Sequence, residues 1–253
     1  MKTTGNTILI TGGGSGIGRA LAEAFHQHGN QVIIAGRRQG MLDEVAAANP
    51  GMATAVLDVT DAADIDRFIA QVGRDHPALN VVINNAGIMR PEDWTSEQVD
   101  TATAHATIAT NLLAPILLTA GLLPQLRAQA QSTVINVSSG LAFLPLAATP
   151  TYSATKAAIH SFSESLRHQL KDTNVDVIEI APPYVQTALM GAHQASDPHA
   201  MPLAEFIAEV MGLMASRPDA AEVLVQRVQH LRFAAGQDQA GYREVFAQVN
   251  APR

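Results

Sequence analysis

Short apolar runs, rich in β-branched residues, alternate along the chain with longer segments in which apolar residues recur at helical spacing. Turn or polar residues bound each run, which is typical of strands buried in a sheet. The runs cover residues 7–11, 31–35, 52–57, 79–84, 132–137 and 175–180. Strands separated by helices favour a parallel sheet with helices on both faces. We therefore predict a single doubly wound α/β domain over residues 1–253.

The last quarter of the chain departs from this regular pattern. Residues 188–202 are irregular, and helical spacing resumes from Leu203. Long irregular segments inside compact domains are often lids or binding loops, so we expect residues 188–202 to form a substrate lid that orders on binding. A seventh strand is expected around residues 228–233.

Composition narrows the class of partner. The 253 residues carry 16 basic and 23 acidic side chains, for a net charge of -7. Nucleic acids and anionic membranes need clustered Lys and Arg, so neither partner is expected. The chain has no cysteine, and its first apolar run is too short for a secretory leader. The most apolar stretch, 112–123, contains Pro115 and is too short for a bilayer. We expect a cytoplasmic protein.

A glycine-rich loop joins the first strand to the first helix. Its sequence is TGGGSGIG, with Gly12, Gly16 and Gly18 at the spacing G-x-x-x-G-x-G. Such glycines permit a tight turn and let the backbone approach a pyrophosphate, which the helix N-terminus then faces with free N–H groups. The alternative is an ordinary glycine-rich turn. The strand before and the helix after favour a Rossmann dinucleotide site.

The end of the second strand bears on which dinucleotide binds. An acidic residue there would accept hydrogen bonds from the ribose 2′-OH and favour NAD. The sequence instead has Gly36, Arg37 and Arg38, and guanidinium groups pair well with a 2′-phosphate. We predict a preference for NADP(H), with NAD(H) as the alternative; these arginines could also be a solvated helix start.

A tyrosine and a lysine lie four residues apart in TYSATK, residues 151–156. Residues 152–171 have helical spacing, so Tyr152 and Lys156 should share one helix face. A nearby ammonium would lower the pKa of the phenol toward the range of a proton donor and acceptor at neutral pH. An isolated pair of this kind is usually a surface pair. Here Ser138 and Ser139 end the fifth strand, where parallel sheets bind ligands and a serine hydroxyl can bond a substrate carbonyl.

Together these motifs resemble the short-chain dehydrogenase/reductase family, in its shorter, single-domain branch. The matches run in order over most of the chain: TGGGSGIG at 11–18, Asp58-Val59, NNAG at 84–87, Asn111, NVSS at 136–139, and Tyr152 with Lys156. Finer similarity, in the segment around Tyr152 and in PPYVQT, is to the subgroup that includes DltE-type oxidoreductases. The resemblance implies hydride transfer between nicotinamide and a carbonyl or alcohol, in a homodimer or homotetramer.

The resemblance also implies roles for individual residues. Tyr152 would be the acid/base, Lys156 would lower its pKa and hold the nicotinamide ribose, Ser139 would orient the carbonyl, and Asn111 would position a water in a proton relay. The implied cofactor-binding residues are Thr11, Gly12, Ser15, Gly16, Ile17, Gly18, Arg37, Arg38, Asp58, Val59, Asn85, Ala86, Gly87, Tyr152, Lys156, Pro182, Val185 and Thr187.

Several expectations stay open at this point. Pro182-Pro183 stands where the family often has Pro-Gly, which puts the shape of the nicotinamide end in doubt. Phe143, Leu144, Leu146 and Tyr184 are candidates for an apolar substrate pocket. No His/carboxylate cluster has metal-ligand spacing, so no metal is expected. The alternatives to an oxidoreductase are a dinucleotide-binding sensor or scaffold without turnover and, less favoured, a nucleotide-sugar epimerase.

Overall fold

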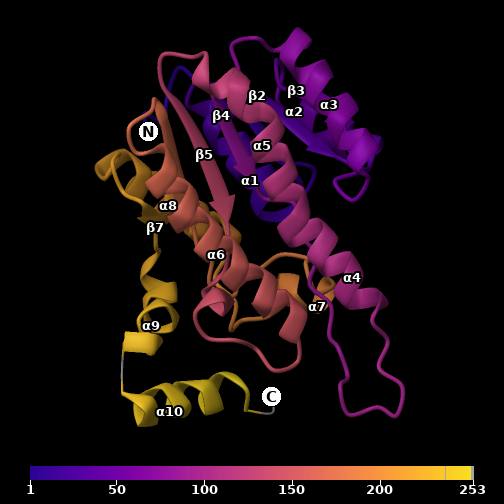
Figure 1. Cartoon of the computed structure of the whole chain (residues 1–253), viewed down its shortest axis with the longest axis vertical. Helices are drawn as coiled ribbons and strands as arrows, with labels where there is room; N and C mark the ends of the chain where they lie inside the picture. Colours follow the sequence, from indigo (N-terminus) through magenta and orange to yellow (C-terminus); the bar gives the residue numbers. More distant parts are fainter. Residues whose placement is uncertain (237, 252–253) are drawn as a thin grey trace.

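The computed structural model describes residues 1–236 and 238–251 and has a parallel sheet of seven strands at its centre (Figure 1). The strand order is β3-β2-β1-β4-β5-β6-β7, and every neighbouring pair is parallel. The strands are β1 Thr7–Thr11, β2 Gln31–Gly36, β3 Ala53–Val56, β4 Val81–Asn84, β5 Ser132–Val137, β6 Val175–Ile180 and β7 Glu222–Val223. The predicted single doubly wound α/β domain is confirmed.

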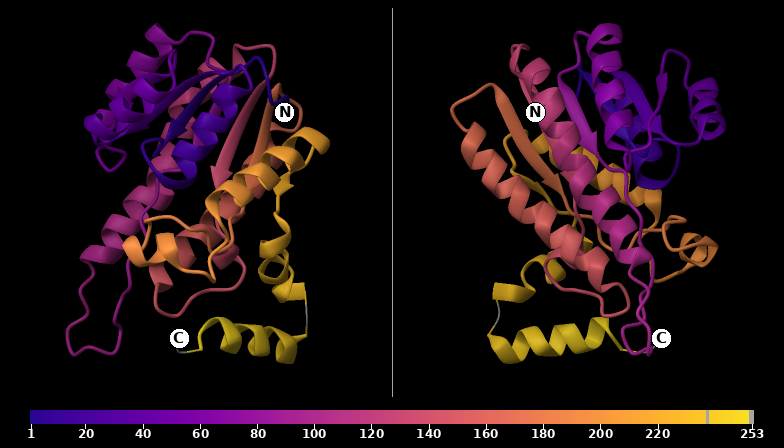
Figure 2. Two further views of the ribbon diagram at one scale, coloured as in Figure 1. Left: turned by 180° about the vertical axis from the view of Figure 1, so that it is seen from behind. Right: turned by 45° about the vertical axis from the view of Figure 1, so that its right-hand side comes forward.

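Helices cover both faces of the sheet because successive side chains of a strand point to opposite sides. The helices are α1 Gly16–Gln27, α2 Gln39–Ala48, α3 Ala62–Asp75, α4 Ala102–Ile108, α5 Ala114–Arg127, α6 Pro150–Leu170, α7 Ala192–Ser196, α8 Leu203–Ser216, α9 Gln229–Arg232 and α10 Gln239–Val249. Figure 1 shows α5 and α6 in front of the sheet, and the reverse view in the left panel of Figure 2 shows α1 and α8 on the opposite face.

Two apolar clusters, one on each face, hold these layers together. On one face Leu21 of α1 and Phe206 of α8 pack with Ile8 and Ile10 of β1. On the other face α3 and α5 pack with Leu9 and its neighbours in β2, β4 and β5. α3 begins after Asp61, whose carboxylate accepts from the backbone N–H groups of Ala63 and Asp64, as expected for an N-cap.

The seventh strand is not where the sequence indicated. β7 is a two-residue strand, and residues 226–232 instead form a 3₁₀ turn followed by α9. Val228, Leu231 and Ala234 recur every three residues and are all buried, so their spacing suits a helix rather than a strand. Beyond α9, α10 lies apart from the sheet, at the bottom of Figure 1.

The apolar stretch around Pro115 is also longer than expected. α4, a π-helical turn at Ala109–Leu113 and α5 form one continuous helix from Ala102 to Arg127. The π-helical turn, a wider turn than the α-helix, lies just before Pro115, where the proline removes a backbone donor. By length and mean hydropathy, 1.7, this helix could cross a membrane. Core helices pass the same test, and Leu118, Leu122 and Leu126 are buried against the sheet.

Candidate active site

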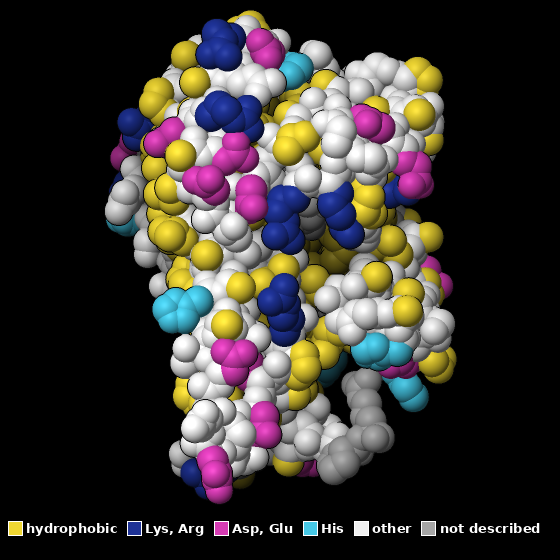
Figure 3. Space-filling model, turned by 90° about the vertical axis from the view of Figure 1, so that its right-hand side faces the viewer, with side chains coloured by type: hydrophobic (Ala, Val, Ile, Leu, Met, Phe, Trp, Pro, Cys, Tyr) yellow, Lys and Arg dark blue, Asp and Glu magenta, His cyan; other side chains and the backbone are white. Residues whose placement is uncertain are grey.

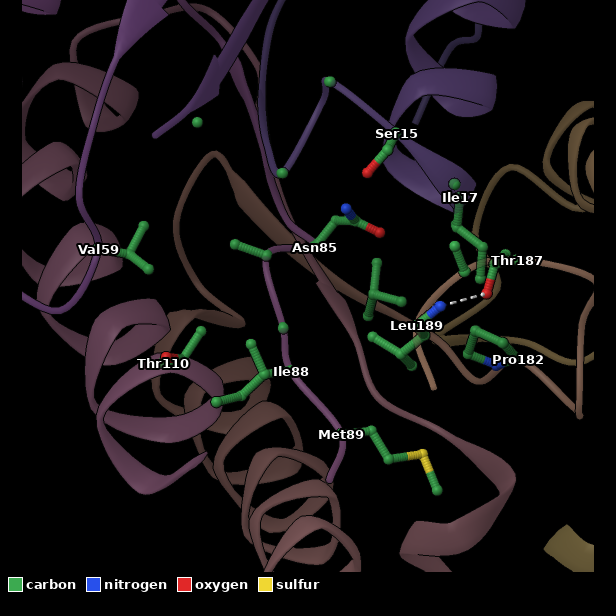
Figure 4. A pocket seen from close by; sticks show the side chains of 18 of the residues that line it. Ser15, Ile17, Val59, Asn85, Ile88, Met89, Thr110, Pro182, Thr187 and Leu189 are labelled. Atoms are coloured by element: carbon green, nitrogen blue, oxygen red, sulfur yellow. Dashed lines mark hydrogen bonds between the residues drawn. The ribbon is translucent and has the colours of Figure 1, made fainter. Parts of the chain in front are cut away.

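A cleft of about 590 Å³ lies at the carboxyl ends of the strands. Most residues expected to bind cofactor line it, namely Gly12, Ser15, Gly16, Ile17, Arg37, Arg38, Val59, Asn85, Ala86, Gly87, Tyr152, Lys156, Pro182, Val185 and Thr187. In Figure 4 Ser15, Ile17 and Thr187 lie on one side of this cleft, with Ile88 and Met89 further along it. Since these segments are far apart in sequence, the fold brings the motifs together.

The glycine loop between β1 and α1 forms part of the cleft wall. Gly16, the first residue of α1, has φ 54°, a conformation that L side chains rarely adopt. A Cβ at Gly18 would fall 2.3 Å from Asn85 Nδ2 and 2.4 Å from the Gly12 carbonyl oxygen. Gly18 does not line the cleft; it allows α1 to approach the ends of β1 and β4. The loop therefore has the shape that a phosphate cradle requires.

Thr11 lies behind the cleft and does not line it. Its hydroxyl oxygen accepts from the backbone N–H groups of Asn85 and Ala86, each at 3.1 Å, and its carbonyl accepts from Asn85 Nδ2 at 2.9 Å. Thr11 thus ties the end of β1 to the segment after β4. It supports the residues that could contact a dinucleotide rather than contacting one itself.

Two arginines flank the cleft at the end of β2. Arg37 and Arg38 are exposed, and in Figure 3 dark-blue Lys and Arg side chains lie beside a hollow in the surface. Among the described residues that line the cleft none is Asp or Glu, although the chain as a whole is acidic. This lining suits an anionic ligand.

Asp58 does not line the cleft, although the sequence suggested an adenine contact. Its carboxylate accepts from the Thr60 backbone N–H at 2.9 Å and the Thr60 hydroxyl at 2.7 Å. The first of these bonds is the main reason that the pKa of Asp58 lies below its ordinary value, and the charge of Arg37 adds to the effect. Asp58 instead shapes the turn that presents Val59 to the cleft.

The three groups expected to do chemistry meet at one end of the cleft. Tyr152 and Lys156 lie one turn apart on α6, Ser139 follows β5, and all three are buried. Lys156 Nζ donates to the Val137 carbonyl at 2.8 Å and lies 5.5 Å from the centroid of the Tyr152 ring. The Ser139 hydroxyl lies within hydrogen-bond reach of Tyr152 and also accepts from the Leu141 N–H.

The expected lowering of the tyrosine pKa by Lys156 is not found. Burial raises the pKa of Tyr152 to about 12, and only the hydrogen bond from Ser139 works in the other direction. Burial also lowers the pKa of Lys156 to about 8, partly offset by the negative charge of Glu179. Both groups are desolvated, so burial has the largest effect on the pKa of each. The ammonium donates its hydrogen bond to the Val137 carbonyl.

Asn111 lies in the π-helical turn and does not line the cleft. Its Oδ1 accepts from the Ile88 N–H and its Nδ2 donates to the Ile88 carbonyl, both at 2.9 Å. Asn111 therefore clamps the backbone after β4. The neighbouring Thr110 does line the cleft and was missed, although it lies beside Asn111 in the motif.

Other residues around the cleft were not found from the sequence. The Glu92 carboxylate accepts from the Thr151 N–H at 3.0 Å and from the Thr151 hydroxyl at 2.7 Å, so it fixes the first turn of α6 beside Tyr152. These partners are 59 positions apart, and no local signal indicates their contact. Missed lining residues include Met41, Leu42, Leu57, Thr60, Ile88, Met89 and Arg90.

The predicted apolar substrate pocket is wrong as stated, since none of its four residues lines the cleft. Leu144 is buried in a separate cluster with Leu231 and residues of α10. The Tyr184 hydroxyl donates to Asp197 at 3.1 Å. Pro182 and Pro183 do line the cleft, and the Pro182 carbonyl accepts from the Gly140 N–H at 2.8 Å.

Comparisons with known proteins agree with this geometry. The family model for short chain dehydrogenases matches residues 6–198. The uncharacterized oxidoreductase DltE of Bacillus subtilis (strain 168) is 45% identical over 189 residues, 75% of either chain. A short chain dehydrogenase from Burkholderia cenocepacia J2315, solved in complex with NADP, is 25% identical over the whole length of both chains, with a TM-score of 0.83.

A second solved structure bears on the fold alone. A short chain dehydrogenase/reductase from Burkholderia phymatum, in complex with NAD, is 18% identical and covers 100% of this chain and 98% of its own, with a TM-score of 0.80. The family model spans more than half of this chain, and the Bacillus relative agrees with it. The chain therefore belongs to the short-chain dehydrogenase family and is an NAD(P)-dependent oxidoreductase.

Proposed function

We propose that this protein uses NADP(H) to interconvert a carbonyl compound and the corresponding alcohol, with Tyr152 as the group that gives and takes the proton. The observation that carries the proposal is the convergence of Tyr152, Lys156 and Ser139 at one end of a cleft whose other end carries Arg37 and Arg38. A bound dinucleotide would span these two ends. The structurally similar proteins hold different dinucleotides, NADP in one and NAD in another.

The residues present fit a dinucleotide. A side chain at Gly16 would be strained, and one at Gly18 would collide with Asn85 and hold α1 away from β1. The two glycines therefore allow the start of α1 to lie where phosphates could bind. Arg37 and Arg38 would hold a 2′-phosphate, and Lys156 and Thr187 would face the nicotinamide end. When bound, the cofactor supplies or accepts a hydride at its nicotinamide ring.

The chain's own residues would handle the proton and the oxygen. In the reductive direction the Tyr152 hydroxyl protonates the carbonyl oxygen as the carbonyl carbon gains its hydride, which gives the alcohol. Ser139 donates a hydrogen bond to the same oxygen. The high pKa of Tyr152, about 12, keeps its proton in place at neutral pH, which suits this direction. Oxidation requires the phenolate, which the charges of Lys156 and of oxidised nicotinamide would stabilise.

A panel of carbonyls and alcohols tests the proposal directly. Purified protein is mixed with NADPH and each carbonyl, or NADP and each alcohol, and the absorbance of reduced nicotinamide is followed. Turnover of at least one compound is expected, and a protein that binds NADPH but turns over none would favour the sensor or scaffold alternative.

The sequence supports two further proposals, a cytoplasmic location and a homodimer or homotetramer. Light scattering of the protein as it elutes from a size-exclusion column tests the oligomeric state.

Replacing both Arg37 and Arg38 with serine is expected to raise the Kd for NADPH about 10- to 100-fold. A charge-assisted hydrogen bond contributes about 1.5–3 kcal/mol. The Kd for NADH should change less than about twofold, because NADH lacks the 2′-phosphate. The measurement is the quenching of protein fluorescence by each dinucleotide. Arg90→Ser removes a charge elsewhere in the same cleft, and a loss of NADPH selectivity there would contradict the assignment.

We further propose that residues 188–202 close over bound dinucleotide. Ala188, Leu189 and Gln194 line the cleft, and Figure 4 shows the Leu189 N–H directed to the Thr187 hydroxyl. Gly191, with φ 106°, lies between these lining residues. Gln194 is buried and donates to the Val185 carbonyl at 2.8 Å.

Saturating NADPH is expected to slow chymotryptic cleavage within residues 188–202 by about tenfold, since proteolysis follows the population of the open segment. The segment has no Lys or Arg, so trypsin cannot report on it. Leu189 is 40% exposed and offers a cleavage site, and Phe233, 57% exposed and absent from the cleft lining, is the internal control. Equal protection of both sites would indicate general stabilisation, and no protection would contradict a lid.

A further inference from the structure

Three titratable side chains from three elements meet beside the catalytic groups. His160 of α6 bonds through Nδ1 to Glu179 Oε2 of β6 at 2.7 Å, and the same nitrogen lies 4.0 Å from Glu222 Oε1 of β7. Glu179 is completely buried, whereas His160 is 18% exposed. Burying a carboxylate costs free energy unless the carboxylate is paired and hydrogen-bonded. The groups bonded to Glu179 must therefore offset that cost.

Glu179 is connected to the catalytic groups on two sides. Its second oxygen accepts from the hydroxyl of Ser138, the residue immediately before Ser139. Lys156 lies one helical turn before His160 on α6, and the charge of Glu179 raises the pKa of Lys156 against the larger effect of burial. The carboxylate is therefore bonded to the residue that precedes Ser139, and its second partner, His160, lies one helical turn from Lys156 on α6.

The hydrogen-bonding pattern favours a positioning role over a metal site. Both oxygens of Glu179 are taken by protein donors. Glu222 receives two bonds from Arg232, at 2.9 and 3.1 Å, and the guanidinium also covers the Phe143 ring at 4.5 Å. A cation would have to displace the imidazole proton and bind next to this guanidinium. Hydrogen bonds to protein donors therefore account for the arrangement of Glu179 and Glu222 without a metal ion.

We propose that Glu179 is a positioning residue for the reaction: it fixes the strand end that carries Ser139 through Ser138, and its charge stabilises the Lys156 ammonium. His160 holds the carboxylate in place. This inference rests on the proposed function. The charged and titratable neighbours are Tyr152 and Glu179 around Lys156, Glu164 on the helix of His160, and Glu222 with Arg232 beyond it.

The decisive experiment measures Lys156 directly and needs no substrate. The chain has three lysines, and the other two, Lys2 and Lys171, are exposed. Protein labelled with ¹³C-lysine is titrated by NMR. In Glu179→Gln, which keeps the shape of the side chain, the Lys156 midpoint is expected to fall by about one pH unit, as for loss of one nearby opposite charge. Lys2 and Lys171 should not move.

Glu164→Gln is the matched control. It removes a carboxylate charge from α6, the helix of Lys156 and His160, 3.8 Å from the His160 ring, but at a side chain that is 60% exposed. The Lys156 midpoint should therefore stay unchanged. An unchanged midpoint in Glu179→Gln, or an equal shift in Glu164→Gln, overturns the proposal. Stoichiometric zinc in the purified protein that is lost in Glu179→Gln also overturns it, in favour of a metal site.

Ser138→Ala provides a second variant that stays informative if Glu179→Gln does not fold. It keeps the carboxylate and removes one of its donors. With NADPH and 4-nitrobenzaldehyde as probe, kcat should fall about tenfold with an unchanged KM for NADPH; an unchanged kcat overturns the proposal. If the wild type reduces no carbonyl at all, the proposed function fails, while the Lys156 titration still decides whether Glu179 acts on the lysine.

Discussion

Replacing Tyr152 with phenylalanine is expected to lower kcat/KM by about 10³-fold while the Kd for NADPH stays within about twofold. General acid–base groups contribute about 10²- to 10⁴-fold to turnover, and phenylalanine has no proton to give. Tyr152 is buried at the cleft end of α6, within reach of Ser139, so water cannot easily take its place. The phenyl ring fills the same space, so the cofactor site should survive.

The measurement pairs steady-state kinetics on the best compound of the panel with NADPH binding by fluorescence. Tyr242→Phe is the matched control, because it makes the same chemical change on α10, where the ring stacks on Phe246 outside the cleft. That variant should keep wild-type turnover. Substantial turnover by Tyr152→Phe would contradict the assigned role, and loss of NADPH binding would show that the variant reports on the fold instead of the proton.

The pattern of apolar runs predicted the sheet because β-branched residues in short buried runs leave few other structures open to the chain. Six strands were found within two residues of their observed ends. β7 was not predicted because its two residues, Glu222 and Val223, are too few to show a periodic pattern. They form a strand by pairing with β6. Residues 228–233, expected as a strand, are apolar at three-residue spacing and form helical turns instead.

The candidate site divides in the same way. Residues in local motifs, such as Gly16, Tyr152 and Lys156, could be found because their spacing along the chain is itself the chemical requirement. Contacts between distant segments could not: Glu92 meets Thr151, and Glu179 meets His160, through the packing of α6 against its neighbours. Phe143, expected in an apolar substrate pocket, packs instead against His160 and under Arg232.

Charge energetics were the least accessible to sequence. The spacing of Tyr152 and Lys156 correctly placed them one turn apart, and from that distance alone pairing should win. The sequence carries no measure of desolvation, however, and both side chains proved almost fully buried, at 6% and 5% exposure. Burial disfavours the charged form of each group, so the tyrosine pKa rises and the lysine pKa falls. The folded state therefore holds the Lys156 ammonium at a free-energy cost relative to the unfolded chain.

Replacing Lys156 with methionine is accordingly expected to stabilise the fold at pH 7 by about 2 kcal/mol while abolishing most turnover. The folded pKa of about 8 lies below the ordinary 10.5, and a difference of this size corresponds to about 3 kcal/mol at 1.36 kcal/mol per unit. About 1 kcal/mol is returned because the hydrogen bond to the Val137 carbonyl is lost. Methionine has a similar length and no charge to desolvate.

The stabilisation should depend on pH with a defined sign. Below pH 8 both states of the wild type hold the lysine proton, so its penalty is complete. Between pH 8 and 10.5 the unfolded state binds more protons than the folded state, so wild-type stability rises with pH. The advantage of Lys156→Met should thus shrink by about 1 kcal/mol between pH 7 and pH 9. Above pH 10 ionisation of Tyr152 adds the opposite trend, because its folded pKa is about 12.

Urea unfolding at pH 7 and pH 9 measures both expectations, with Lys171→Met as the control because that lysine is exposed. The control should change stability by less than about 0.5 kcal/mol at either pH. A Lys156→Met protein that is less stable than wild type at pH 7, or whose advantage is the same at both pH values, would mean that the lysine is not held against a desolvation cost. A gain in stability with loss of turnover would instead show that this fold gives up stability to keep an ammonium beside Tyr152.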